Sequence, residues 1–261
     1  MQAPLAYVLH LADNALILGQ RNAEWCGHGP ILEEDLALSN NSLDLIGQAR
    51  LLYQHAASLS LETHTTEDRL AYFRDVPEFR NYTMLELPHS LALAPTASGD
   101  RNYAVTIARN FLYSALMVLI WEALSSSKDA QLAAIAAKSL KETQYHLRHA
   151  RDWLLRMGDG TDESHARIQA ALTHLMPYTQ EFWTSSAQET AAIESGAGAD
   201  TRTLQTNWND VVDHTLVEAT LKRPSSDGFV TTGKQGVHSE HLGFVLSEMQ
   251  SLARAHPEAV W

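Results

Sequence analysis

The feature that most constrains this chain is a nearly unbroken apolar stretch, Phe111–Trp121, which reads FLYSALMVLIW. Eleven residues are too few to cross a bilayer as a helix, which takes about 20 residues. A helix that is apolar on nearly every side belongs in the core of a protein. The stretch therefore predicts a central helix, from about Asn102 to Leu124, that other elements must surround.

Composition supports a large soluble core and narrows the choice of partner. The chain has 261 residues, 45% of them hydrophobic, and a formal net charge of −12. That content is too apolar for a disordered chain. The acidic balance argues against nucleic acid, which needs a basic footprint.

The cysteine count and the first residues of the chain indicate the cellular compartment of the protein. Cys26 is the only cysteine, so no disulfide can form within the chain, which fits a reducing compartment. The first residues carry no positive charge, and Asp13 interrupts their apolar run, so they do not read as a signal peptide. We expect a cytoplasmic protein that contacts no membrane.

Helix signals dominate the chain, and strand signals are scarce. Pro30 followed by acidic residues indicates a helix start, and Asp129 and Ser239 indicate N-caps. Pro77 counts against one short helix, and Pro177 should bend one long helix. The expected helices are Leu5–Glu24, 30–58, Asp68–Phe79, Asn102–Leu124, 129–157, Asp162–Glu189, Arg202–Leu221 and Ser239–Ala255.

Three segments read as loops because they are rich in Gly, Pro, Ser or Thr: Pro88–Asp100, Gly196–Asp200 and Arg223–Val237. No internal repeat and no interdomain linker is visible. The sequence therefore predicts one all-α domain over residues 1–261, a four-helix bundle with additional helices.

The segment KETQYHLRH places a carboxylate and two imidazoles on one predicted helix. Carboxylate-bridged di-iron bundles take a Glu from each of two helices and Glu-x-x-His from each of the other two. Here Glu142 has Tyr145 at the His position, and His146 comes one residue late. We expect Glu142 and His146 to bond each other, or Arg and Tyr neighbours, in a polar core.

The other predicted helices complete the ligand set no better. Asp44 has Gly47 where His should stand. The first helix offers Asp13, or Glu24 if the register differs, and Glu122 lies near the end of the third. A working site would lack at least one Glu and two well-placed His, so the pattern indicates a degenerate di-iron centre. A metal site using Asp44, Glu142 and His146 remains the alternative.

Three shorter motifs have ordinary structural explanations. Glu24–His28 is favoured as a turn between helices, with a reactive Cys26 thiol as the alternative. Thr232–Gly236 lacks the order of a phosphate-binding loop and is equally typical of a hairpin-like loop that contacts a partner. His238–His241 is not the zinc-enzyme motif, and Ser239 there reads as a helix cap.

Three long segments, in matching order, resemble the C subunits of the bacterial phenylacetyl-CoA epoxidases, also called phenylacetate-CoA oxygenases. The resemblance covers nearly the whole chain and is weaker from about Thr63 to Arg101. It implies a ferritin-like fold and a non-catalytic structural subunit. The segments are LADNALILGQRNAEWCGHGPILEEDLALSNNSLDLIGQAR, KETQYHLRHARDWLLRMGDGTDES and TTGKQGVHSEHLG.

The resemblance also implies partners and cofactors. In such complexes a catalytic A subunit, related in fold, holds the di-iron centre and binds the CoA thioester, and the C subunit pairs with it. The oxygenase is completed by a B subunit, and a reductase with FAD and an iron-sulfur cluster supplies electrons from NADPH. This chain is then expected to hold no cofactor. Whether isolated chains form homodimers is left open by the sequence.

In relatives the C subunit also touches the CoA part of the substrate, phenylacetyl-CoA, at the edge of the A-subunit site. The resemblance places one contact segment at Glu78, Phe79, Arg80 and Asn81, where Glu78 and Arg80 depart from the family pattern. Arg80 would meet a CoA phosphate, and an ordinary solvated Arg is the alternative. A second strip falls at Thr190, Ala191 and Ala192.

Three functions are therefore weighed. The first is a scaffold that stabilises a homologous catalytic bundle. The second is an oxygenase with its own iron at Asp44, Glu142 and His146. The third is an iron-storage bundle, for which the sequence offers no carboxylate cluster typical of a ferroxidase centre.

Overall fold

The computed structural model describes residues 2–93 and 101–259, and every regular element within them is a helix. The nearest approach to a strand there is an isolated bridge between Thr232 and Val237. The predicted all-α class is confirmed. The predicted loop Pro88–Asp100 falls partly on residues 94–100, which lie outside the described residues.

The chain divides into two compact units. Unit 1 combines the first part of the chain, Met1–Leu87, with its last part, Thr232–Trp261, and unit 2 is Pro88–Thr231. The prediction of a single domain over residues 1–261 stays a prediction.

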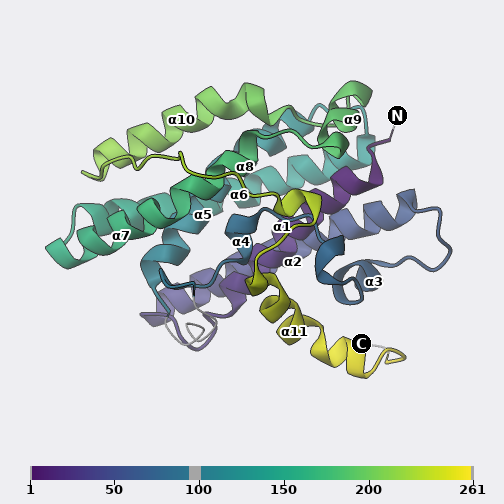
Figure 1. Ribbon diagram of the computed structural model, residues 1–261, viewed down its shortest axis with the longest axis horizontal. Coiled ribbons are helices and arrows are strands. Elements are labelled where there is room, and N and C mark those ends of the chain that lie inside the picture. The colour runs from purple at the N-terminus through teal and green to yellow at the C-terminus, as the bar shows by residue number, and fades with distance from the viewer. Residues whose placement is uncertain (1, 94–100, 260–261) are drawn as a thin grey trace. The chain divides into compact units, whose positions relative to one another are not determined.

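Unit 1 is built on two long helices, α1 (Leu5–Ala23) and α2 (Leu32–Leu59), which lie side by side (Figure 1). The loop between them is the predicted turn around Cys26. Shorter elements pack on this pair: α3 (Glu67–Tyr72), the 3-10 turn η1 (Val76–Glu78), α4 (Thr83–Glu86), the 3-10 turn η4 (Gly233–Gln235) and α11 (Glu240–Ala255).

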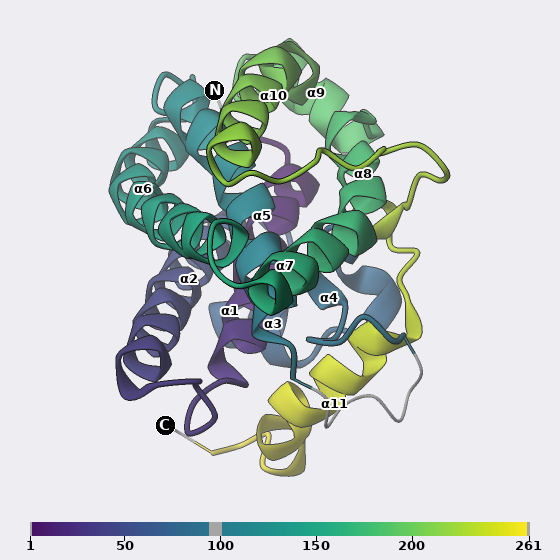
Figure 2. The same cartoon turned by 90° about the vertical axis from the view of Figure 1, so that its left-hand side faces the viewer.

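Unit 2 is built on α5 (Tyr103–Leu124) and α6 (Ala130–Gly158), which pack along each other. In Figure 2, α6, α7 and α10 surround α5. The remaining elements are α7 (Asp162–Leu175), the 3-10 turn η3 (Met176–Thr179), α8 (Gln180–Trp183), α9 (Ala187–Ser195) and α10 (Thr201–Glu218).

The predicted central helix is α5, and its burial follows from its sequence. It is long and apolar enough to cross a membrane by composition, yet 89% of its most apolar window is buried within the protein. The Trp208 indole of α10 donates to the Leu112 carbonyl at 3.1 Å, so even its backbone is contacted. This is the behaviour of the core helix of a soluble protein, as the sequence predicted.

The predicted caps are present. Asp129 accepts from two backbone N–H groups at the start of α6, and Ser239 accepts from His241 at the start of α11. Asn102 caps α5 in the same way. These side chains satisfy N–H groups that a helix start leaves without partners, which is why the predicted starts are accurate.

The predicted continuous helix Asp162–Glu189 is wrong. The structure breaks it into α7, η3, α8 and α9, because Pro177 forces a 3-10 turn and Thr184 is extended. Ser186 then caps α9 and Glu189 bonds back to it, which forms a capping box. A bend at Pro177 was expected, but a second helix start at Ser186 was not.

The predicted helix Asp68–Phe79 is also shorter than expected. It is α3 followed by the separate turn η1, in which Pro77 occupies an early helical position. The one-turn helix α4 was not predicted at all. Both differences lie in the segment where the resemblance is weakest.

Candidate functional site

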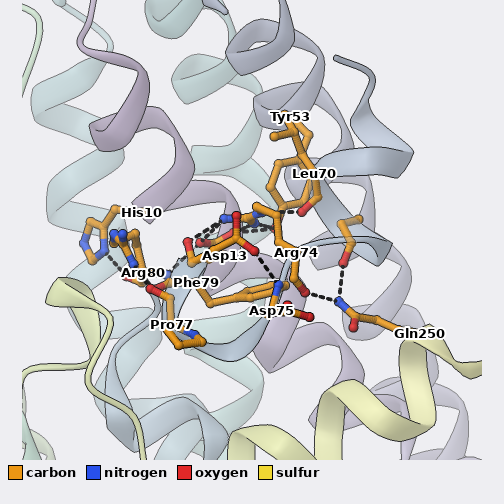
Figure 3. A network of polar contacts seen from close by, with 12 residues as sticks. His10, Asp13, Tyr53, Leu70, Arg74, Asp75, Pro77, Phe79, Arg80 and Gln250 are labelled. Atoms are coloured by element: carbon orange, nitrogen blue, oxygen red, sulfur yellow. Dashed lines mark hydrogen bonds and ion pairs between the residues drawn. The ribbon is translucent and has the colours of Figure 1, made fainter. Parts of the chain in front are cut away.

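A buried carboxylate, Asp13 of α1, is the centre of a polar network in unit 1 (Figure 3). A buried charge is costly unless other groups neutralise and hydrogen-bond it. Both Arg74 guanidinium Nη atoms donate to its carboxylate, one of them at 3.1 Å. The Tyr53 hydroxyl donates at 2.5 Å, and the backbone N–H of Arg80 donates at 2.7 Å. The four bonds use the capacity of a carboxylate.

Arg74 is fixed from every side of its guanidinium. Its Nε donates to the Leu70 carbonyl at 2.6 Å, and Nη1 also donates to the Glu78 carbonyl at 3.0 Å. Its planar group lies 4.3 Å from the centre of the Phe79 ring, a cation–π contact. The Asp13–Arg74 pair therefore fastens the segment after α3 to α1.

The network keeps its donors protonated. Burial by itself would lower the pKa of Arg74, but the negative charge of Asp13 and the hydrogen bonds raise that pKa above its usual value. Burial raises the pKa of the Tyr53 hydroxyl well above its usual value, and the charge of Asp13 raises it further. Asp13 is therefore a neutralised structural anion, not an open metal ligand.

The four residues predicted to contact CoA lie directly beside this network, and only two are accessible. Phe79 and Asn81 have no exposed surface, whereas Glu78 is exposed and Arg80 is half-buried. The Arg74 guanidinium lies over the Phe79 ring. The Asn81 amide donates to the Glu86 carboxylate at 2.8 Å. The buried side chains of Phe79 and Asn81 thus fix the conformation of the segment, whereas the side chains of Glu78 and Arg80 are accessible to a ligand.

The backbone of Arg80 is held rigidly. Its N–H donates to Asp13, and its carbonyl accepts from His10 Nδ1 at 2.6 Å (Figure 3). Its guanidinium donates to the carbonyls of Pro77 and Phe79, both at 2.7 Å. The side chain is thus folded over the segment. A ligand phosphate would have to replace these intramolecular acceptors.

A second buried carboxylate, Glu86 of α4, organises the other end of the segment. His238 Nδ1 lies 2.8 Å from Glu86 Oε2, and the Ser239 backbone N–H donates to Oε1 at 2.6 Å. Neither the Glu86 nor the His238 side chain has exposed surface. This cluster joins residues 238–239 to the N-terminal part of unit 1.

The two nitrogens of His238 both face acceptors. Nε2 donates to the Phe79 carbonyl at 3.0 Å, and Nδ1 faces the Glu86 carboxylate. A neutral imidazole supplies only one donor, so one further proton must lie between Nδ1 and Oε2. Asn81 and Ser239 donate N–H groups to the same carboxylate. The imidazole and the carboxylate are therefore joined by a hydrogen bond that carries this proton.

The second predicted contact strip lies in α9 of unit 2. Thr190 and Ala191 are exposed, whereas Ala192 is buried. The Thr190 hydroxyl donates to the Ser186 carbonyl at 3.0 Å, as helical Thr residues often do. Thr190 and Ala191 are therefore the accessible members of the strip. A contact with CoA at either strip stays a prediction.

On α6 the inward-facing register is not the one predicted. Thr143 and His146 are buried, whereas 47% of Tyr145 is exposed. Glu142 is at the edge of the helix, where its carboxylate pairs with Lys138. The buried pattern is thus Thr143-x-x-His146, with Thr where the Glu-x-x-His pattern of di-iron bundles has Glu. His146 is buried, and the bonding of Glu142 and His146 in a polar core stays a prediction.

On α2 the residues Asp44 and Gly47 are both half-buried, at the flank of the buried face. The buried positions between them and around them carry Asn41, Leu45 and Gln48 instead. Within residues 2–93 and 101–259, no three His, Cys, Asp or Glu side chains come together as a metal site would require. Neither helix, taken by itself, presents the Glu-x-x-His pair of a di-iron bundle on its buried face.

The contacts of the shorter motifs, Glu24–His28 and Thr232–Gly236, are those of turns that connect helices. Cys26 is exposed in the turn after α1. Thr232–Gly236 forms η4, and its Lys234 is buried with its ammonium 5.6 Å from the centre of the Tyr82 ring. An added Cβ at Gly233 would lie 2.5 Å from the Asn81 carbonyl, so this loop packs closely on the Arg80 segment.

Sequence reasoning missed the pairs that build this site. Asp13 and Arg74 are 61 residues apart, and Glu86 and His238 are 152 apart. Partners so distant leave no periodic pattern, so only the fold reveals them.

Comparison with known proteins identifies a relative of this chain and a matching family. Its sequence is 44% identical over 256 residues to the C subunit of the 1,2-phenylacetyl-CoA epoxidase of Escherichia coli (strain K12), covering 98% of each chain. The family described as "Phenylacetic acid catabolic protein" matches residues 1–261. The chain therefore belongs to the family of phenylacetic acid catabolic proteins.

Proposed function

We propose that this chain is the non-catalytic structural subunit of a phenylacetyl-CoA ring epoxidase. In this role it pairs with the di-iron catalytic A subunit and stabilises it. The observation that carries the proposal is the inward register of α6, Thr143-x-x-His146, in a chain that is 44% identical to the C subunit of an epoxidase. The fold is kept while the carboxylate ligand of that helix is replaced.

Unit 1 supports the same proposal from another direction. The carboxylate that α1 buries, Asp13, is neutralised by Arg74 and hydrogen-bonded by Tyr53. An ion pair of this kind supplies the charge balance that iron would supply in a metal-holding bundle.

The wider assembly follows from the same role. The di-iron centre belongs to the A subunit, and FAD and the iron-sulfur cluster belong to the reductase component. With a B subunit as its third part, the oxygenase epoxidises the aromatic ring of phenylacetyl-CoA with O₂ and NADPH in the cytoplasm. The acidic chain described here contributes packing, not redox chemistry.

A contact with the CoA part of the substrate would use the accessible residues of the two strips. Arg80 and Glu78 are reachable in unit 1, and Thr190 and Ala191 are reachable in unit 2. Arg80 is the cation among them and would bind a CoA phosphate by charge-assisted hydrogen bonds. The buried residues would affect CoA binding only indirectly, because they fix the backbone conformation of the two strips. These residues are Phe79, Asn81 and Ala192.

The test is to produce the A subunit alone and together with this chain. Soluble A subunit and NADPH-dependent epoxidation should require co-production with this chain. Iron should be near zero in this chain purified alone after anaerobic Fe(II) loading, and about two per di-iron site in the A subunit. A soluble and fully active A subunit without this chain would overturn the proposal.

Glu142 distinguishes a scaffold from an oxygenase with its own iron. Glu142→Ala in this chain should leave epoxidation by the complex unchanged, because Glu142 pairs with Lys138 at the surface. Glu163→Ala, at an exposed position of α7, is the matched control. Loss of turnover in Glu142→Ala alone, together with bound iron, would assign the chemistry to this chain.

A further inference from the structure

Three side chains of α1 hold the backbone of the segment that ends at Tyr82. His10, Asp13 and Asn14 are spaced i, i+3 and i+4, so they share one face of the helix. Asp13 accepts from the Arg80 N–H at 2.7 Å, and His10 Nδ1 donates to the Arg80 carbonyl at 2.6 Å (Figure 3). Asn14 Oδ1 accepts from the Tyr82 N–H at 2.8 Å. This face of α1 therefore bonds alternate residues of the segment, as a neighbouring strand would.

Asn14 also decides which nitrogen of His10 carries the proton. The Asn14 amide nitrogen lies 3.4 Å from His10 Nε2 and slightly farther, 3.5 Å, from Nδ1. An amide N–H only donates, so Nε2 is the acceptor and the proton of the neutral imidazole is on Nδ1. Nδ1 is then the donor that the Arg80 carbonyl requires. His10 and Asn14 thus act as one unit on the backbone of Arg80.

The last part of the chain also contacts this segment. His238 Nε2 donates to the Phe79 carbonyl at 3.0 Å. An added Cβ at Gly236 would lie 2.5 Å from the Pro77 carbonyl oxygen and 2.6 Å from Arg80 Nη1. The Arg80 guanidinium therefore occupies space that exists only because residue 236 has no side chain.

Arg80 carries a charge that the chain does not neutralise with a carboxylate. Its guanidinium donates to two carbonyls and forms no ion pair within residues 2–93 and 101–259. A phosphate that replaced those carbonyls would receive charge-assisted hydrogen bonds, which are about twice as strong as neutral ones. A side chain that is held in place before binding also loses less entropy when the ligand arrives. The groups that fix Arg80 therefore affect how tightly it binds an anion.

We propose that His10, Asn14 and Gly236 are positioning residues for the binding of a CoA thioester. His10 and Asn14 fix the backbone of Arg80, and Gly236 leaves space for its guanidinium, which then meets the phosphates of the CoA part. Each of the three acts through Arg80 and not by touching the ligand. This inference deepens the proposed function and rests on its CoA contact.

The test measures the Kd of phenylacetyl-CoA for the purified complex of the A subunit with this chain. Titration calorimetry without the reductase avoids turnover. His10→Phe keeps an aromatic ring beside Tyr82, 4.8 Å away between ring centres in the wild type, but removes the donor. It should raise the Kd about three- to tenfold, the cost of ordering one more side chain on binding. His10→Asn should restore the wild-type Kd, because its amide nitrogen can donate to the same carbonyl.

Two comparisons separate positioning from a general loss of stability. His165→Phe removes a bond of the same kind in unit 2, between Nδ1 and the Gly158 carbonyl at 2.7 Å, and should leave the Kd unchanged. Phenylacetyl-pantetheine lacks the phosphates of CoA, so it should bind the wild-type and His10→Phe complexes equally.

A double variant tests whether His10 acts through Arg80. Arg80→Met should raise the Kd of phenylacetyl-CoA at least as much as His10→Phe does, because it removes the cation. The chain with both substitutions should bind no more weakly than Arg80→Met alone, since residues that act through one group are not additive.

Gly236→Ala tests the same inference at the guanidinium. It should also raise the Kd about three- to tenfold, because its Cβ displaces the Arg80 side chain that is ordered in the wild type. Gly27→Ala is the matched control. Both glycines have a positive φ, 88° and 77°, so both substitutions strain the backbone, but an added Cβ at Gly27 meets no atom within 4 Å.

The outcomes distinguish this inference from the proposed function. A wild-type Kd in His10→Phe, or a loss that adds in full to that of Arg80→Met, would overturn the inference and leave the proposed function standing. If His10→Phe does not fold by circular dichroism, a wild-type Kd in Gly236→Ala overturns it in the same way. An unchanged Kd in Arg80→Met would instead remove the CoA contact itself, and the inference with it.

Discussion

Two buried carboxylates organise unit 1, and each is bonded by a group far away in sequence. Asp13 accepts from Arg74, Tyr53 and the Arg80 backbone, and Glu86 pairs with His238. Removing one partner of such a pair leaves an uncompensated buried charge, which is costlier than replacing both partners. Replacing Arg74 alone should therefore cost more than replacing an exposed member of an ion pair.

Arg74→Met should destabilise the protein by about 3–5 kcal/mol, because Asp13 would remain buried without its cation. Arg223→Met is the matched control. Arg223 also pairs with an aspartate, Asp213, at 2.6 Å, but both side chains are partly exposed. Exposed pairs contribute about 0–1 kcal/mol. Urea unfolding followed by circular dichroism measures both, and equal losses would show that burial of the Asp13 pair has no energetic role.

Alkaline pH should unfold the protein before its buried tyrosines ionise. Burial raises the pKa of both Tyr53 and Tyr113. A raised pKa in the folded state means full stability below the unfolded value, about 10, and a progressive loss as pH rises above it. Spectrophotometric titration should show these two of the eight tyrosines ionising only with unfolding. Ionisation of all eight in a still-folded chain would contradict this.

At the scale of single elements, the sequence predicted helices best where a side chain next to the first helical residue caps the helix. Asp129 and Ser239 are correct N-caps, and the apolar stretch correctly predicted α5. The break before α9 was missed although Ser186-x-x-Glu189 is a capping-box pattern, because the continuing helix periodicity was given more weight. The inward register of α6 was missed by one residue, about 100° around the helix.

Two helical glycines should respond to Ala in opposite directions. At Gly158, the last residue of α6, an added Cβ would lie 2.3 Å from the Ala219 carbonyl, so Gly158→Ala should destabilise by at least about 1–3 kcal/mol through overpacking. At Gly243 of α11 no atom lies within 4 Å of the added Cβ. Gly243→Ala should stabilise by about 0.5–1 kcal/mol through helix propensity. Thermal unfolding checks both, and a stabilised Gly158→Ala would mean that α6 and α10 do not pack this closely.

At the scale of the whole molecule, the chain's two ends build one unit. The segment from Thr232 onward returns to the N-terminal helices, and the Glu86–His238 pair fastens it there. The Gln250 amide adds bonds to the carbonyls of Ala71 and Arg74, at 3.2 and 3.1 Å. None of this was predictable, because local sequence patterns carry no information on contacts between residues more than a hundred positions apart.

His238→Ala should loosen the C-terminal segment, because the buried Glu86 carboxylate would lose a hydrogen-bond partner. We expect a loss of about 1–3 kcal/mol of stability. Amide exchange should become faster in residues 232–255 and in the segment around Phe79. His256→Ala, at an exposed position just after α11, is the control and should change neither. Unchanged exchange in His238→Ala would show that the pair does not fasten the segment.

The use of both chain ends in unit 1 has a consequence during synthesis. Translation proceeds at about 5–20 residues per second, so the ribosome needs several seconds or more to make residues 88–231. During that interval α1 and α2 are complete, but the Glu86 carboxylate still lacks His238. Unit 2 is complete before unit 1 can be. The first residues to emerge are thus among the last to be finished, and unit 1 depends longest on protection from aggregation in the cell.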